Sequence, residues 1–159
     1  MIGVVSNSAG RADSLATVVD IFHASGVQTV VHCGDVGGRH VLDVLKGFDA
    51  LYVWGDRDND RMGLMRYGRN LGLSCLGILG DFDFDEKHVC VTHGDDPKLM
   101  RQICEEQQYD YVLCGHALAA EDRIVGRTRI INPGSLYGGA AKSALLLDPL
   151  SGNLKLLAL

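Results

Sequence analysis

The stretch Thr29-Val30-Val31-His32-Cys33-Gly34-Asp35 decides the fold class. It is a mostly apolar run that ends in a glycine and then an acidic residue. Similar runs of four to six residues, rich in Val, Ile or aromatic side chains, lie at Ile2–Val5, Ala50–Trp54, His88–Thr92 and Tyr109–Cys114. Strands that are apolar nearly throughout are typical of a sheet covered on both faces. The pattern predicts an α/β fold.

Helical periodicity appears between these runs. Leu15, Val18, Val19 and Phe22 recur at helical spacing, which predicts a helix with Asp13 or Ser14 as its N-cap, ending before Gly26. Shorter sets of apolar residues at helical spacing predict further helices around 41–45, 64–71 and 99–103.

After Gly115 the pattern changes to pairs of short apolar runs. These runs, at 123–125 with 129–131 and at 144–147 with 154–157, predict two hairpins. We expect a layered α/β sandwich whose second sheet comes largely from the C-terminal third. The acidic alternation Asp81–Asp85 predicts a solvated hairpin edge rather than a calcium loop, because Phe occupies the intervening positions.

Composition bounds the class of protein. A length of 159 residues with 47% hydrophobic and 22% charged residues fits one domain, 1–159. The net charge is −5 and the 15 Lys and Arg are scattered, so we expect no nucleic-acid partner and no membrane partner. The N-terminus has no basic region and only a short apolar run, which favours a cytoplasmic protein. The five cysteines form no C-x-x-C pair and are expected to be reduced and mostly buried.

Polar residues follow each predicted strand. They are Ser6-Asn7-Ser8, Gly34-Asp35, Gly55-Asp56-Arg57-Asp58, His93-Gly94-Asp95 and Gly115-His116. In an open α/β sheet such residues converge beyond the carboxyl ends of the strands. Each one alone is more often a turn or a structural histidine. Together, two carboxylates and two imidazoles suit a divalent ion such as Mn, Fe, Zn or Ni, which predicts a metal site at Asp35, Asp56, His93 and His116.

The order of these motifs resembles a known family. The motifs 31–35, 54–58, 91–94, 114–116 and 131–135 are similar to those of calcineurin-like metallophosphoesterases. The resemblance is to their small single-domain branch of phosphodiesterases, which also contains the retromer scaffold subunit. It implies a four-layer α/β/β/α sandwich of two mixed sheets, with a two-metal site for phosphoester hydrolysis at the strand ends.

The sequence departs from the family pattern at three positions. The family opens with Asp-x-His where this chain has Ser6 and Ser8, and its last motif carries a second histidine where this chain has Leu118. The resemblance implies that all three missing groups serve the same metal, so we expect that first site to be lost. Asp35, His93 and His116 match family ligands, and Asp56 replaces an asparagine. We therefore expect one divalent ion, with a vestigial centre as the competing interpretation.

Three further residues are candidates for supporting roles. Arg57 could clamp a phosphate or simply be solvated, and Asn132 opens a loop that resembles the family's loop against the site; both are expected to bind substrate. Asp58 could orient a neighbouring group or cap the following helix, and the cap is the favoured interpretation.

Two functions of different class follow. The first is a weak metal-dependent hydrolase that acts on a small phosphomonoester or phosphodiester, or a protein that binds such a molecule without cleaving it. No catalytic residue is assigned beyond the residues expected to hold the metal. The alternative is a catalytically inactive scaffold that recruits a protein partner on the same fold. The sequence is also compatible with a homo-oligomer.

Overall fold

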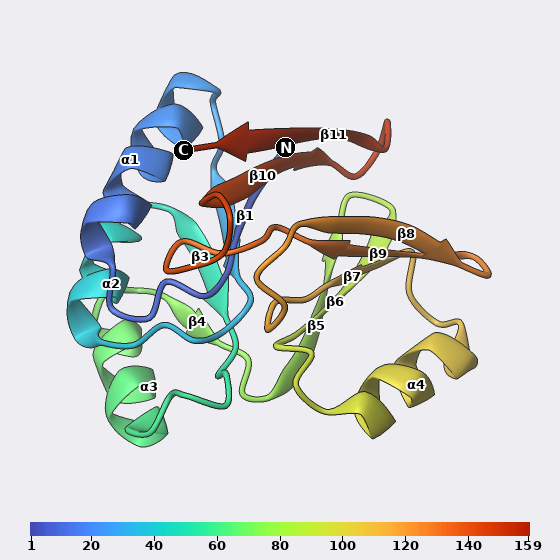
Figure 1. Ribbon diagram of the computed structural model, residues 1–159, viewed down its shortest axis with the longest axis horizontal. Coiled ribbons are helices and arrows are strands. Elements are labelled where there is room, and N and C mark those ends of the chain that lie inside the picture. The colour runs from blue at the N-terminus through green and yellow to red at the C-terminus, as the bar shows by residue number, and fades with distance from the viewer.

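The computed structural model describes residues 1–159 as two β-sheets flanked by helices (Figure 1). The first sheet has the order β11-β10-β1-β2-β3-β4, and the second has the order β5-β6-β7-β9-β8. The strands of the first sheet are β1 (Ile2–Val5), β2 (Thr29–His32), β3 (Asp49–Tyr52), β4 (Ser74–Cys75), β10 (Ser143–Asp148) and β11 (Asn153–Ala158). Those of the second are β5 (Leu79–Phe84), β6 (Lys87–Thr92), β7 (Tyr111–Leu113), β8 (Glu121–Val125) and β9 (Thr128–Asn132).

Four helices cover the outer faces of the sheets. In Figure 1, α1 (Ala12–Ala24), α2 (Arg39–Val44) and α3 (Arg61–Asn70) lie along the first sheet, and α4 (Pro97–Glu106) lies on the side of the second. Three buried clusters correspond to the three interfaces between layers: Phe22 packs between α1 and the first sheet, Val91 between the sheets, and Ile103 between the second sheet and α4. The predicted four-layer α/β/β/α sandwich is confirmed.

Parallel strands form the centre of each sheet and position the candidate site. β1, β2 and β3 are parallel neighbours in the first sheet, as are β6, β7 and β9 in the second. Their carboxyl ends carry the polar residues that the sequence places after each strand. No helix is both long enough and apolar enough to cross a bilayer.

The expected origin of the second sheet is correct only in part. Three of its strands, β7, β8 and β9, lie in the C-terminal third of the chain, whereas β5 and β6 do not. The C-terminal hairpin β10–β11 instead extends the first sheet, with β10 antiparallel to β1. The reason is the burial of β10 on both faces: Leu145 and Leu147 face the second sheet, whereas Leu146 faces the helices. A strand that is apolar on both faces is buried most completely between two neighbours.

The expected N-cap of α1 is also wrong. The helix begins after Arg11, which makes no side-chain capping hydrogen bond, so Asp13 and Ser14 lie inside the first turn. Ser14 Oγ instead accepts a hydrogen bond of 2.8 Å from Lys142 Nζ, a contact 128 residues away in sequence. At the other end, Gly26 has a φ of +70° and follows the C-cap, as predicted.

Gly3 allows β1 and α1 to pack closely, and this gives a test of the fold. A Cβ at this position would overlap the ring of Phe22, which is fully buried. We expect Gly3→Ala to lower the free energy of unfolding in urea by about 1–3 kcal/mol, the usual cost of overpacking. Gly138→Ala is the control, because its Cβ would meet only Leu118 at 3.9 Å. Equal stability of the two variants would contradict this packing.

Candidate metal centre

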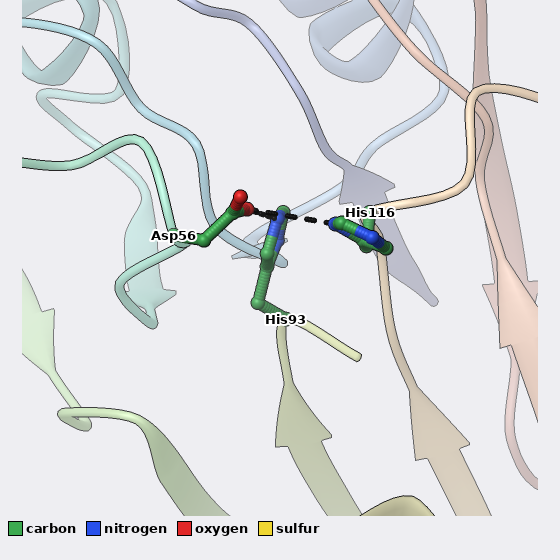
Figure 2. A group of neighbouring side chains, drawn as sticks. All are labelled: Asp56, His93 and His116. Carbon is green, nitrogen blue, oxygen red and sulfur yellow. Dashed lines mark hydrogen bonds and ion pairs between the residues drawn. The ribbon is translucent and has the colours of Figure 1, made fainter. Parts of the chain in front are cut away.

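Three side chains of metal-ligand type converge where the two sheets meet (Figure 2). Asp56 lies after β3, His93 after β6 and His116 after β7. Their ligand atoms all lie within 4.8 Å of one another. Asp56 Oδ1 is 3.1 Å from His93 Nε2 and 3.5 Å from His116 Nδ1, so one carboxylate oxygen lies near both imidazoles.

Asp35 lies beside this group, just beyond β2. Its Oδ1 is 3.5 Å from His93 Nε2 and accepts a hydrogen bond of 3.0 Å from the backbone N–H of Arg57. Its backbone is left-handed, with a φ of +55°. This conformation turns the chain sharply off the strand, and an aspartate tolerates it better than most residues. Of the four ligands predicted from the sequence, Asp56, His93 and His116 form the group whose ligand atoms are mutually close, and Asp35 lies next to it through its contact with His93.

A hydrogen bond to the backbone fixes the ring of His93. Its Nδ1 donates to the carbonyl oxygen of Cys33 at 2.7 Å, which leaves Nε2 as the atom facing Asp35 and Asp56. Metal-binding histidines are typically oriented by such a bond from the other ring nitrogen. Two carboxylates and two imidazoles also form a donor set that suits a first-row divalent ion. The residues present therefore fit a metal.

The electrostatics of Asp35 and His93 reflect their mutual contact. Burial alone would lower the pKa of His93, but the carboxylate of Asp35 and the carbonyl of Cys33 raise it above its ordinary value. Burial alone would raise the pKa of Asp35, but hydrogen bonds from His93 and the Arg57 amide lower it. The protein therefore favours a carboxylate beside an imidazole that readily accepts a positive charge.

Asp58 joins the two loops that carry the predicted aspartate ligands. Its carboxylate accepts hydrogen bonds from the N–H groups of Val36 at 3.1 Å, Gly37 at 2.9 Å and Gly55 at 2.9 Å. The favoured interpretation of Asp58 as a helix cap is wrong, because α3 is capped by Asp60, whose side chain accepts from the N–H of Gly63. Asp58 is buried, and its carboxylate instead binds the backbone N–H groups of the two loops.

Ser6, Ser8 and Leu118, the positions of the expected missing ligands, offer little to a cation. Ser6 and Ser8 are both fully buried. Ser8 Oγ donates to the carbonyl of Val36 at 3.1 Å and lies 2.7 Å from His32 Nε2, while Ser6 Oγ has no hydrogen-bond partner. Leu118 lines a cavity of about 240 Å³ together with Asp35 and His116.

Arg57 and Asn132 occupy different environments. Arg57 lines the same cavity, with its side chain 65% exposed and its Nε 3.8 Å from Asp35 Oδ2. Asn132 is buried, and its Nδ2 donates to the carbonyls of Gly115 at 2.8 Å and Ala117 at 3.1 Å, while its Oδ1 accepts from the N–H of Gly134. The amide of Asn132 thus holds the loop that carries His116. Asn132 is not among the residues that line the cavity, so the structure gives no support to its expected contact with substrate.

Sequence reasoning assigned no role at this site to Asn7, Ala9 or Tyr137, which also line the cavity. Asn7 has a φ of +50°, and its Nδ2 donates to the carbonyl of Ala117 at 3.3 Å. Asparagine tolerates this left-handed conformation well, which is a weak signal of a turn after β1. Nothing in the local pattern indicates Tyr137, because it lies in a loop far from the ligands in sequence.

Comparison with known protein families matches residues 1–149 to the calcineurin-like phosphoesterase superfamily domain. The chain belongs to this superfamily. It is 25% identical to phosphodiesterase MJ0936 of Methanocaldococcus jannaschii over 142 residues. This match covers 86% of this chain and 84% of the relative. The solved structure of an archaeal phosphodiesterase has a TM-score of 0.92 at 21% identity, over 99% of both chains. Zinc-bound Vps29 of Entamoeba histolytica has a TM-score of 0.66 at 17% identity, over 99% of this chain and 97% of that one.

Replacing Asp58 tests its role in joining the two loops. Asp58→Asn would present an amide to three N–H donors, so we expect the free energy of unfolding in urea to fall by about 2 kcal/mol, the scale of hydrogen bonds to a charged group. Asp60→Asn keeps an oxygen acceptor at an exposed N-cap, where asparagine caps about as well as aspartate, and should cost less than about 0.5 kcal/mol. An Asp58→Asn protein as stable as the Asp60→Asn protein would refute the role assigned here.

His32 predicts how stability changes with pH. It is fully buried, and burial lowers its pKa from 6.5 to about 4, in spite of the nearby carboxylate of Asp58. As the pH falls, the imidazole of His32 therefore gains its proton in the unfolded chain before it does so in the folded chain. The free energy of unfolding that is present above pH 6.5 should fall by about 3 kcal/mol in total as the pH approaches 4.

Urea unfolding at pH 7 and pH 4.5, with a chelator present, measures this loss. His32→Gln should flatten the dependence relative to the native chain, whereas His40→Gln, at an exposed histidine, should leave it unchanged. Identical slopes in all three proteins would exclude His32 as the titrating group.

Proposed function

We propose that the protein is a metal-dependent phosphoesterase that works with a single divalent ion. The ion would be held by Asp35, Asp56, His93 and His116. The observation that carries the proposal is the position of Asp56, whose one carboxylate oxygen is within 3.5 Å of both imidazoles. An asparagine there could offer an oxygen but no charge.

The charge and type of the donors favour one ion from the group Mn, Fe, Zn and Ni. Two carboxylates balance the charge of one divalent cation, and imidazole suits these transition metals better than it suits magnesium or calcium. When bound, the ion supplies a Lewis acid that polarises the phosphoryl oxygens and lowers the pKa of water.

The second cation site of the family is proposed to be lost in this chain. On that side only Asp35 offers a charged oxygen, because Ser8 is engaged by Val36 and His32. Leu118 offers no donor atom. A single ion leaves part of the transition-state charge uncompensated, so we expect hydrolysis slower than that of a two-metal enzyme by several kcal/mol of barrier.

The remaining residues of the site have distinct proposed roles. The exposed guanidinium of Arg57 binds the phosphate, since its planar fork matches two phosphoryl oxygens. Asn132 acts as a positioning residue for His116 through its bonds to the carbonyls of Gly115 and Ala117. The substrate is a small phosphomonoester or phosphodiester that enters the cavity of about 240 Å³.

The alternative function is a catalytically inactive scaffold for a protein partner. It is favoured by the exposed Leu118 and Tyr137 at the mouth of the site, where apolar side chains suit a protein surface better than a phosphate. It is also favoured by the likeness of the fold to Vps29.

Metal content and turnover separate the two functions. We expect about one ion per chain by elemental analysis after loading with Mn, Zn or Ni, and slow metal-dependent hydrolysis of bis(p-nitrophenyl) phosphate. Asp56→Asn should weaken binding of the ion by ten- to a hundredfold in calorimetry, because it removes the negative charge of the carboxylate that lies next to both imidazoles. Asp20→Asn, at an exposed acidic residue of α1 away from the ligands, is the control and should bind the ion as the native chain does.

Two ions per chain would overturn the single-site proposal. No ion and no turnover under any of these conditions would leave the scaffold as the function.

A further inference from the structure

We propose that a second cavity beside the candidate metal centre binds the organic arm of a phosphodiester, and that this arm is a nucleoside. The inference rests on the proposed function for the position of the phosphate. It adds the class of substrate, which the ligand residues alone do not specify.

The second cavity has a volume of about 620 Å³ and lies between the start of α1 and the segment Tyr137–Lys142. This volume falls within the range of pockets that bind small organic molecules. Tyr137 lines both this cavity and the cavity of about 240 Å³ at the metal centre. A diester whose phosphate lies at the metal centre can therefore extend its organic arm past the ring of Tyr137.

The protein fixes the backbone at Tyr137 while its side chain stays accessible. Ser135 Oγ accepts hydrogen bonds of 3.1 Å from the N–H groups of Tyr137 and Gly138, and donates to the carbonyl of Asn7 at 3.4 Å. The guanidinium of Arg11 lies over the ring, 5.9 Å from its centroid. The ring is thus held in place yet 47% of the residue is exposed, which leaves aromatic surface for stacking.

The remaining walls of the cavity combine small residues, polar residues and one large apolar side chain, that of Leu159. Residues 138–141 are only glycine and alanine, so a flat ring can approach their backbone. Across the cavity Lys142 Nζ donates to Ser14 Oγ at 2.8 Å, beside Asp13 and Thr17. One positive and one negative charge line the cavity, which suits an uncharged arm with donors and acceptors at its edge.

A nucleobase combines these features, since it has a π-face for Tyr137 and a hydrogen-bonding edge for the polar wall. A lipid arm would place hydrocarbon against the exposed polar side chains of Asp13 and Thr17, and a glycerol arm would leave the ring of Tyr137 uncovered.

Two esters with the same leaving group test the inference. Thymidine 5′-(p-nitrophenyl phosphate) carries the nucleoside arm, and methyl p-nitrophenyl phosphate lacks it. We expect the native chain to prefer the nucleoside ester in kcat/KM. Tyr137→Leu should lower kcat/KM for the nucleoside ester about tenfold more than for the methyl ester, the effect of losing one stacking ring. Tyr137→Phe should behave as the native chain, and Thr17→Trp, which fills the cavity, as Tyr137→Leu.

Tyr109→Leu is the matched control, because Tyr109 packs against His88 on the second sheet, outside both cavities. It should leave the ratio between the two esters unchanged. Equal effects of Tyr137→Leu on both esters, or no preference in the native chain, would overturn the inference even if metal-dependent hydrolysis is present.

Equilibrium binding separates this inference from the proposed function. By calorimetry, thymidine 5′-monophosphate should bind at least tenfold more tightly than methyl phosphate, and Tyr137→Leu should remove the difference. If neither ester is hydrolysed but this difference is found, the nucleoside site stands and the catalytic function fails. If the two phosphates bind equally, the nucleoside site is refuted.

Discussion

The carboxylate of Asp58 is the contact on which the geometry of the candidate metal centre depends. It accepts hydrogen bonds from the backbone N–H groups of Val36, Gly37 and Gly55. Val36 and Gly37 directly follow Asp35, and Gly55 directly precedes Asp56. A buried carboxylate is stable only where donors replace its water shell, and three amides do so here. Because the three donors come from two loops, the distance between the predicted aspartate ligands is set by a residue that is not a ligand.

The same principle explains how the chain accommodates the buried hydroxyl of Ser8, at a position where the resemblance led us to expect a metal ligand. Ser8 donates to the carbonyl of Val36, so its oxygen accepts the Nε2 proton of His32. The hydroxyl of Ser8 thus braces the loop of Asp35 and contacts a histidine whose pKa is lowered by burial. Ser6 Oγ and His32 Nδ1 are both left without a hydrogen-bond partner, which is the visible cost of this arrangement.

The sequence predicts what depends on local pattern, and fails where long-range packing decides. The strands and the residues that follow them are correct because period and position specify both, and the side chains of Asp56, His93 and His116 converge as a result. The sheet joined by β10 and β11 is not predictable in this way, since a hairpin can extend either sheet and only burial against β1 decides. Asp58 has the same local pattern as a helix cap, and its true partners at Val36 and Gly37 are distant in sequence.

The candidate centre has a buried half and an exposed half, and they depend on different forces. The side chains of His93 and Asp35 are 0% and 6% exposed and are held by backbone groups, whereas those of Asp56 and His116 are 44% and 51% exposed. The buried half is part of the fold, because removing it would leave the carbonyl of Cys33 and the amide of Arg57 without their partners. The exposed half contributes little to the core and is free to change. A chain of this family can therefore lose metal chemistry without losing its fold, which makes a scaffold the physically closest alternative to a hydrolase.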